Sequence, residues 1–397
     1  MTDATLVLNA GSSSLKFAMF ERRHGLPLLV KGSISSLHDK PRLKVSTAHD
    51  EPRTEMTLGK GSIDSQATLE FILRDIGERG LPQKITNVGH RIVHGGSRFT
   101  APAILDRSTL KALDQLVPLA PIHQSRNLEI VELVAGVLPE AVQVGCFDTA
   151  FHADRPHVAM LYGLPRALTE SGVISFGFHG ISYGYVASKL KARYGSNAGG
   201  RATVAHLGSG ASLCAMREGK SLATTMGFSP LDGLVMSTRC GSLDPGVVIH
   251  LLRDRKMSVE GLSKLLYDQS GLLGVSGISG DMRTLLETDD PAATEAIDLF
   301  VYRAGREIGS LAAAAGGLDT LVFTAGIGEN SPFIREKICQ AAGWLGVQVD
   351  PERNRRSEAC ISVSGSAVDV LVIPTDEERA VAEQMLSIIP IADNHSG

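Results

Sequence analysis

Short apolar runs that end in glycine- and serine-rich turns recur along the chain. The first run, at residues 5–8, is aliphatic and β-branched and leads into NAGSSSLK at residues 9–16. This pattern predicts a buried strand, a tight loop and a second strand over residues 15–19. A strand, a glycine-serine loop and a strand are predicted again at residues 203–213. An internal two-fold repeat with a cleft between two similar lobes would account for the chain length, although such turns are also common without a repeat.

Other segments show the periodicity of helices or of buried strands. In residues 65–78, Leu69, Ile72, Leu73 and Ile76 recur at helical spacing. Helices are also predicted at residues 126–136, 182–191 and 292–315, and strands at residues 85–93, 142–152, 321–323 and 370–373. A closing helix follows Thr375, the predicted N-cap, with Glu378 three residues later. The 42 glycines indicate many tight turns, of the kind that nucleotide-binding α/β folds use.

Composition narrows the class of protein. The 397 residues are 43% hydrophobic and 21% charged, enough apolar material for two or three domains. A net charge of −4 gives no basic footprint for nucleic acid. Five widely spaced cysteines without a C-x-x-C pair predict neither disulfides nor zinc, and favour a reducing cytoplasm. We expect no export signal and no membrane span, because no long apolar run is present.

Glycine-rich loops after strands are candidate phosphate sites. In the first loop, hydroxyls, backbone N–H groups and Lys16 suit a phosphate chain, because Gly11 lets the backbone approach closely. The alternative is an ordinary turn with solvated serines. Residues 324–330, TAGIGEN, form a third such loop before a predicted helix. Three loops of this kind in one chain favour phosphate binding more strongly than any one of them.

Four charged or titratable residues stand in glycine-bearing loops or at strand ends. Arg91 precedes a glycine pair and Arg239 lies in a glycine-bearing loop, so each is either a surface charge or an anion clamp. Asp148 ends a predicted buried strand, and in open α/β sheets ligands collect at the carboxyl ends of strands. His179, in GFHG, is either structural or catalytic.

Together these motifs resemble the acetate, propionate and butyrate kinase family over nearly the whole chain. The matching stretches are NAGSSSLK (9–16), GHRIVHGG (89–96), LAPIH (119–123), FDTAFH (147–152), GFHG (177–180), HLGSGAS (206–212), STRCGSLDP (237–245), TAGIGEN (324–330) and PTDEE (374–378). The resemblance implies the two-lobed fold of actin, sugar kinases and Hsp70 ATPase domains, built from duplicated ribonuclease H-like domains. It places the N-terminal lobe at residues 1–150, completed by 377–397, and a nucleotide-binding lobe at 151–376.

The resemblance also implies a homodimer, ATP, Mg²⁺ or Mn²⁺ in its place, and reversible phosphoryl transfer to acetate, with weaker activity on propionate. A carboxylate acceptor is ionised at pH 7 and needs no general base, but it needs cations beside the polyanion. The implied catalytic groups are Arg91, Asp148, His179 and Arg239. Arg91 and Arg239 would hold the acceptor and the phosphates, and His179 would donate to the transferring group. Mg²⁺ is expected among Asn9, Asp148 and Glu377.

Carry-over from the family assigns further contacts. Nucleotide contacts are implied at Ser12, Ser14, Lys16, His206, Leu207, Gly208, Ser209, Gly210, Asp281, Met282, Arg283, Gly326, Ile327, Gly328, Glu329 and Asn330. An apolar pocket for the acceptor is implied at Val93, Ile122, Phe178 and Pro230. Valine at position 93 favours acetate, because a smaller residue there accompanies propionate in the family. One methylene is worth only about 1–3 kcal/mol, so some propionate activity is expected.

The sequence departs from the usual family pattern in several places. Ser209 stands for Asn, Ser242 for Asp and Ser237 for Gly, and Tyr183 stands where His is frequent. Residues 124–126 replace an Asn-Pro stretch. Three alternatives remain: a propionate-preferring acyl kinase, a hydroxyl-directed sugar kinase, and a regulatory nucleotide-binding protein. Asn9 and the paired arginines argue against a sugar kinase, which carries Asp in the first phosphate loop and needs a base.

Overall fold

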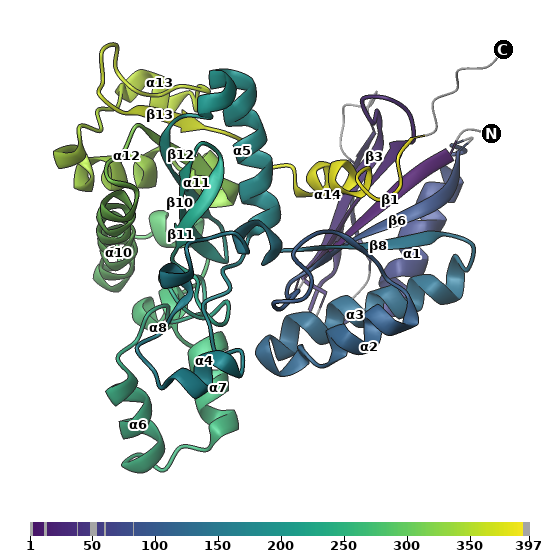
Figure 1. Ribbon diagram of the computed structural model, residues 1–397, viewed down its shortest axis with the longest axis horizontal. Helices are drawn as coiled ribbons and strands as arrows, with labels where there is room; N and C mark the ends of the chain where they lie inside the picture. The colour runs from purple at the N-terminus through teal and green to yellow at the C-terminus, as the bar shows by residue number, and fades with distance from the viewer. Residues whose placement is uncertain are drawn as a thin grey trace. The chain divides into compact units, whose positions relative to one another are not determined.

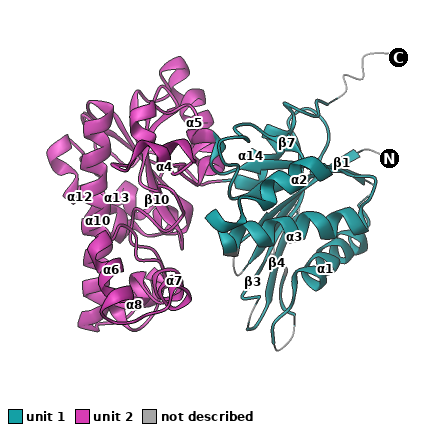
Figure 2. Cartoon of the chain, turned by 60° about the horizontal axis from the view of Figure 1, so that its bottom comes forward, with its two compact units in different colours: residues 1–150, 376–397 teal, residues 151–375 magenta. Residues whose placement is uncertain are grey.

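The computed structural model describes residues 3–11, 14–37, 39–47, 54–58, 61–81 and 83–391 (Figure 1). The chain divides into two compact units (Figure 2). The first unit comprises residues 1–150 and 376–397, and the second comprises residues 151–375. The C-terminal segment therefore packs with the N-terminal part of the chain.

The described residues of the first unit form a mixed sheet in the order β5-β4-β3-β2-β1-β6-β8-β7. The strands are β1 (Asp3–Ala10), β2 (Leu15–Glu21), β3 (Leu28–Ser35), β4 (Arg42–Thr47), β5 (Thr54–Thr57), β6 (Lys84–Ile92), β7 (Ala103–Ile104) and β8 (Val142–Phe147). β1, β6 and β8 run parallel, β2 is antiparallel to β1, and β3 is antiparallel to β2. The carboxyl ends of β1, β6 and β8 therefore meet at one edge of the sheet.

Helices cover both faces of this sheet. They are α1 (Ser65–Glu78), α2 (Arg107–Asp114), α3 (Pro121–Val137) and α14 (Glu377–Met385). Leu6 and Leu8 share a buried cluster with Ile72 of α1 and Val134 of α3. Successive side chains of a strand point to opposite faces, so Val7 and Asn9 face α14 instead. The sheet thus separates an apolar face, under α1 and α3, from a face that carries polar groups toward the start of α14.

Gly89 on β6 allows α14 to approach the sheet closely. A Cβ at this position would lie 2.5 Å from Sδ of Met385 and 2.7 Å from Cγ1 of Val381. Any larger residue would therefore displace the helix. The first glycine of GHRIVHGG therefore allows α14 to pack closely on β6.

The second unit repeats the same strand arrangement. Its strands are β9 (Arg201–Leu207), β10 (Ala211–Arg217), β11 (Lys220–Thr224), β12 (Thr320–Thr324) and β13 (Asp369–Val372). Among the described residues the order is β11-β10-β9-β12-β13, with β9, β12 and β13 parallel and β10 antiparallel to β9 and β11. This order matches β3-β2-β1-β6-β8. The predicted α/β class and duplicated ribonuclease H-like topology are confirmed.

The helices of the second unit are α4 (Arg166–Glu170), α5 (Gly180–Tyr194), α6 (Pro245–Arg253), α7 (Val259–Asp268), α8 (Gly271–Ser276), α9 (Met282–Leu286), α10 (Pro291–Ala315), α11 (Ala325–Asn330), α12 (Pro332–Ala341) and α13 (Pro351–Arg355). Short 3₁₀ helices occur at Val117–Leu119, Ala150–His152, His157–Met160, Gly195–Asn197 and Gly343–Leu345. Tyr183 and Leu190 of α5 pack on Val204 and Val322 of the sheet. α10 starts at the Asp290 cap and ends at Gly316, whose φ is 75°.

Several local expectations differ from the structure. The strand predicted at residues 142–152 ends at Phe147, and Ala150–His152 form a 3₁₀ helix. Helix α3 begins at Pro121 rather than at residue 126, because proline is suited to the first helical position. The N-cap of α14 is Asp376, not Thr375, because the Asp376 carboxylate accepts the N–H of Arg379. Residues 325–330 are themselves the short helix α11, whereas a turn before a helix is predicted.

Candidate active site

In the first unit, a buried polar cluster lies at the carboxyl ends of β1, β6 and β8. We call it the Arg91 cluster, formed by Asn9, Arg91, Asp148, Glu377 and Glu378. Asn9 lies two residues after Val7 on β1, and Arg91 lies two residues after Gly89 on β6. Because alternate residues of a strand share one face of the sheet, Asn9 and Arg91 lie on the face that carries α14. Asp148 follows β8, and the two glutamates open α14. Sequence analysis selected four of these five residues.

Arg91 and Asp148 form the centre of the Arg91 cluster. Nη2 of Arg91 donates to Oδ2 of Asp148 over 2.6 Å, and Nε lies 3.1 and 3.0 Å from Oδ1 and Oδ2. Nη1 of Arg91 donates to Oδ1 of Asn9 over 3.1 Å and lies 3.6 Å from Oε2 of Glu377. The Asp148 side chain is only 2% exposed. The fork of the guanidinium thus fixes both neighbours in place.

Asn9 connects Arg91 to the start of α14. Its Nδ2 donates to Oε2 of Glu377 over 2.8 Å and to Oε1 of Glu378 over 3.0 Å. On the far side of the cluster, Nζ of Lys31 lies 3.0 Å from Oδ1 of Asp376 and 3.4 Å from Oε2 of Glu378. Both glutamates at the start of α14 therefore accept hydrogen bonds from Asn9 on β1.

The electrostatics of this region favour an added cation. Burial raises the pKa of Asp148 above its ordinary value, while Arg91 opposes this shift. Burial would lower the pKa of Arg91, but Asp148, Glu377 and Glu378 together raise it. Among the described residues here, four carboxylates face three cations: Arg91, Lys31 and Arg379, which lies 3.9 Å from Asp376. With all of them ionised, a surplus of negative charge remains.

The donor set fits Mg²⁺ by its chemistry. Carboxylates of Asp148 and Glu377 are hard oxygen ligands, and Mg²⁺ typically uses one or two of them together with water and substrate phosphates. The oxygen of Asn9 already accepts from Arg91, so Asn9 fits an orienting role beside the metal better than that of a ligand. Within the described residues, no group of three or more His, Cys, Asp or Glu forms a ready metal cage.

The structure describes most of the remaining predicted residues of the first unit. Lys16 is the cross-strand neighbour of Asn9 and is exposed. The carbonyl of Ser14 accepts the N–H of Gly11 over 2.8 Å, which closes the first loop, whereas Ser12 lies outside the described residues. Val93 follows β6 and is buried. Ile122 lies in α3, and its side chain is not among those described.

In the second unit, His179 belongs to a buried hydrogen-bonded group at the start of α5. Its Nδ1 lies 2.8 Å from Oγ of Ser212, which lies 2.6 Å from the hydroxyl of Tyr183. The His179 ring stacks on His206, with centroids 4.2 Å apart. His206 Nδ1 lies 2.9 Å from Oγ of Ser182. His179 adopts a left-handed backbone with φ of 58°, a conformation that costs about 1–2 kcal/mol and is typical of functional positions.

Gly210 brings His179 and Arg239 to one place. A Cβ on Gly210 would lie 3.3 Å from Nε2 of His179 and 3.6 Å from both Nη atoms of Arg239. Nη1 of Arg239 also donates to the carbonyl of Pro230 over 2.9 Å. A ring nitrogen and a guanidinium therefore border the same glycine, an arrangement suited to an anionic group.

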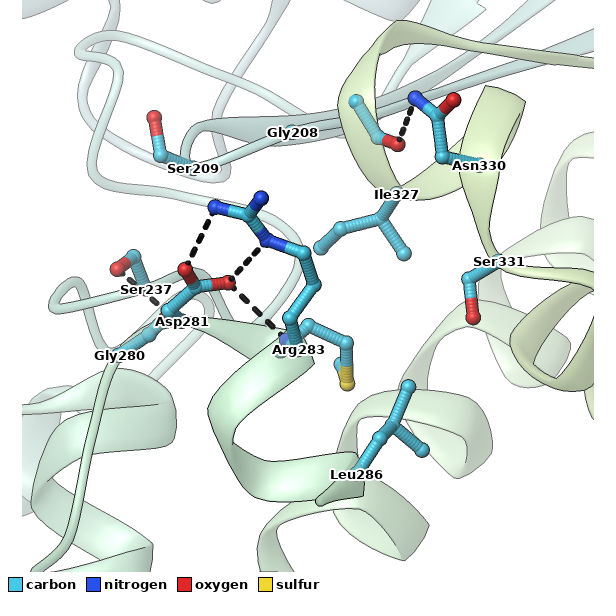
Figure 3. Close-up of a pocket in the computed structure, with 12 residues that line it drawn as sticks. Gly208, Ser209, Ser237, Gly280, Asp281, Arg283, Leu286, Ile327, Asn330 and Ser331 are labelled. Carbon is cyan, nitrogen blue, oxygen red and sulfur yellow. Dashed lines mark hydrogen bonds and ion pairs between the residues drawn. The ribbon is translucent and has the colours of Figure 1, made fainter.

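Near these residues, a cavity of about 600 Å³ opens in the second unit (Figure 3). Its lining comes from four separate segments of the chain: Gly208, Ser209, Ser237, Gly280, Asp281, Met282, Arg283, Leu286, Gly326, Ile327, Asn330 and Ser331. Eight of these are residues for which nucleotide contact was predicted. Asp281 and Arg283 pair within the cavity wall, with Nη2 2.9 Å from Oδ2. The volume is in the range of small-molecule sites.

Other predicted contact residues lie outside this lining. Leu207 is fully buried. Oε1 of Glu329 accepts the N–H groups of Ala325 and Thr375 over 2.8 and 2.9 Å, so its described role is to hold the loop. Gly328 packs near the carbonyl of Ala205. The roles predicted for the second-unit residues His206, Leu207, Gly210, Gly328 and Glu329, and for Phe178 and Pro230 in the acceptor pocket, remain predictions.

Sequence analysis missed several residues of both sites. Glu378 was predicted only as the capping partner of Thr375, and Lys31 was given no role. Ser237 was noted only as a departure, yet its hydroxyl donates to the carbonyl of Gly280 over 2.7 Å and lines the cavity. No local pattern singles out Leu286 or Ser331 of the lining.

Among the residues that the structure describes, no helix is both long and apolar enough to cross a membrane.

Comparisons with known proteins cover almost the whole chain. The model of the Acetokinase family matches residues 4–383. An acetate kinase from Rhodopseudomonas palustris (strain TIE-1) is 49% identical over 395 residues, 97% of this chain and 98% of that protein. A solved propionate kinase from Francisella tularensis subsp. tularensis SCHU S4 is 34% identical with a TM-score of 0.88, covering 96% and 98% of the two chains. A solved Porphyromonas gingivalis acetate kinase is 35% identical with a TM-score of 0.85, covering 98% and 100%.

Proposed function

The chain belongs to the acetokinase family, and we propose that it transfers the γ-phosphoryl group of ATP reversibly to acetate, giving acetyl phosphate and ADP by in-line displacement. The observation that carries this proposal is the family match over residues 4–383. That range includes every residue of the Arg91 cluster, the His179 group and the cavity. Reversible transfer to propionate at a lower rate is part of the proposal.

The cavity of the second unit is the proposed nucleotide site. Met282, Leu286 and Ile327 offer apolar contact for a base or sugar, and backbone groups at Gly208 and Gly326 can approach phosphates closely. Support comes from the lining itself, because its segments include three of the glycine-bearing loops predicted from the sequence.

Arg91 is the proposed clamp for the acceptor carboxylate. A guanidinium has five N–H donors, and three of them are engaged by Asp148 and Asn9 among the described residues. Nη1 also faces Oε2 of Glu377 at 3.6 Å, so the second N–H of Nη2 is the donor proposed for an incoming carboxylate. Acetate is ionised at pH 7, so no base is required, and Asp148 fits the role of orienting Arg91 rather than that of a proton acceptor.

Charge stabilisation during transfer is assigned to His179 and Arg239. Both border Gly210, and in phosphoryl transfer the protein mainly positions the groups and neutralises charge on the equatorial oxygens. Further neutralisation would come from Mg²⁺, or Mn²⁺, held by Glu377 and Asp148, with Asn9 orienting both glutamates of α14.

A propionate-preferring acyl kinase is the second candidate. The solved propionate kinase resembles the chain about as closely as the solved acetate kinase does. Val93 favours acetate, because its β-branched side chain would narrow the space for a second methylene. We further propose a homodimer in the cytoplasm, which light scattering on the purified protein and cell fractionation would test.

A hydroxamate-trap assay with ATP and Mg²⁺ tests the proposal on acetate, propionate and butyrate in parallel. We expect the highest rate on acetate and loss of activity in Arg91→Ala. Arg253→Ala, an exposed arginine on α6 whose side chain is 72% accessible, is the matched control and should keep full activity. No turnover on any acid by a protein that still binds ATP would contradict the kinase proposal. A preference for propionate of about twentyfold would favour the second candidate, since it is opposite in direction to the selection expected from Val93.

A further inference from the structure

His179 stands at one end of a hydrogen-bonded chain that leads into the core of the second unit. Nδ1 of His179 lies 2.8 Å from Oγ of Ser212, and the same Oγ lies 2.6 Å from the hydroxyl of Tyr183. Tyr183 and Ser212 are both fully buried. Neither residue belongs to the groups assigned above to nucleotide, acceptor or metal.

The direction of the protons along this chain follows from its buried end. Among the described residues, Ser212 is the one hydrogen-bond partner of the Tyr183 hydroxyl. Burial raises the pKa of Tyr183 well above its ordinary value, so the phenol keeps its proton. If the phenol accepted instead, that proton would be buried without an acceptor, at the full desolvation penalty. Tyr183 therefore donates to Ser212.

Because Ser212 accepts from Tyr183, its own proton is available to His179. We propose that Tyr183 and Ser212 are positioning residues that hold His179 as the tautomer with its proton on Nε2. Ser212 donates to Nδ1, which must then be an unprotonated acceptor, and the neutral ring carries its one proton on Nε2.

A proton on Nε2 fits the surroundings of this atom, which lies beside Gly210 and Arg239. Nε2 of His179 and both Nη atoms of Arg239 surround the position that a Cβ of Gly210 would occupy. An N–H at Nε2 can donate to a phosphoryl oxygen there, whereas a bare nitrogen would repel it. Stacking on His206 fixes the plane of the His179 ring. The hydrogen bond from Ser212 then determines which ring nitrogen carries the proton. The catalytic part of the inference rests on the proposed function; the tautomer assignment does not.

Tyr183→Phe is the decisive variant. It keeps the aromatic ring, which contacts Phe151, His152 and His206, and removes only the terminal proton donor. Tyr194→Phe is the matched control, because Tyr194 lies on the same helix and donates to Asp369 over 2.6 Å at the opposite end. The readout is the pair of ¹⁵N shifts of His179 in histidine-labelled protein, assigned by loss of the signal in His179→Gln, together with kcat and the KM for ATP.

We expect wild type and Tyr194→Phe to show His179 protonated on Nε2. In Tyr183→Phe the Nδ1-protonated form should become populated, and kcat should fall about fivefold, the factor for one net hydrogen bond, with little change in KM. An unchanged tautomer in Tyr183→Phe would overturn the proposal, even if kcat fell through altered packing. A tautomer shift in a protein without kinase activity would support the positioning chain and contradict only the proposed function.

Discussion

The Asp148 carboxylate is held side-on by the Arg91 guanidinium, with Nη2 2.6 Å from Oδ2 and Nε 3.1 Å from Oδ1. Arg91 lies on β6 and Asp148 directly follows the neighbouring parallel strand β8, and the pairing is nearly closed to solvent. Removing Asp148 takes away the closest hydrogen-bonded partner of a buried guanidinium, which is the basis of the first prediction.

Asp148→Ala is expected to destabilise the protein by about 3 kcal/mol, because Arg91 loses its closest partner while buried. Urea denaturation followed by circular dichroism measures this. Glu352→Ala is the control: its ion pair with Arg355 is largely exposed, and we expect no measurable change. Equal stability of the two variants would show that the Arg91 cluster tolerates loss of its central carboxylate.

Gly89→Ala is expected to cost about 1–3 kcal/mol, since its Cβ would meet Met385 and Val381 of α14. Displacement of α14 would also move Glu377 and lower the kinase rate. Gly77→Ala in α1 is the control, because a Cβ there meets nothing within 4 Å, and it should stabilise the protein by up to about 1 kcal/mol. A fully stable, fully active Gly89→Ala would refute the close packing of α14 on β6.

Stability should fall in mild acid through buried histidines. Burial lowers the pKa of His90 from 6.5 to about 4, and its Nε2 lies 2.7 Å from Oε1 of Gln143. Between pH 6.5 and 4 the unfolded chain binds more protons at this site, so its contribution is complete above pH 6.5 and lost as the pH falls. The contribution is about 3 kcal/mol at most.

Melting temperatures of wild type and His90→Gln between pH 7.5 and 4.5 check this prediction. In His90→Gln the melting temperature should depend less on pH than in wild type. His250→Gln, which replaces an exposed histidine on α6, should show the full pH dependence of the wild type. Parallel curves for wild type and His90→Gln would contradict the prediction.

Ser209→Asn should tighten nucleotide binding, because it restores the amide usual in the family at the cavity wall. One added hydrogen bond corresponds to about a fivefold lower KM for ATP. Titration calorimetry with ADP gives the same change without turnover. Ser188→Asn on the exposed side of α5 is the control. A weaker ADP affinity in Ser209→Asn would mean that this chain uses the serine differently.

Val93→Ala should raise the ratio of propionate to acetate turnover by about fivefold or more, the equivalent of one methylene of space. Val134→Ala, buried in α3 under the opposite face of the sheet, removes the same volume and should leave the ratio unchanged. Steady-state kcat/KM values on propionate and acetate give this ratio for wild type and both variants. If both variants shift the ratio equally, Val93 has no special role in size selection.

The sequence alone determined the class of fold, and it supplied most of the candidate site residues. Apolar runs before glycine loops mark the central strands, because burial and tight turns each demand particular residue types. Arg91 and Asp148 were recognisable as site candidates because they end such strands, and parallel strands bring their carboxyl ends together. The motif order added the family, which the comparisons confirmed.

Only the tertiary structure decided which residues meet across long separations. Asn9 contacts Glu377, 368 positions away, because α14 returns to the first sheet and Gly89 lets it approach. Ser212 joins Tyr183 to His179 because β10 runs antiparallel to β9 beneath α5. Local patterns record periodicity and turns, but the partners of a buried polar group are set by how separate elements pack. For that reason Glu378, Ser212 and Tyr183 acquired roles only in the folded chain.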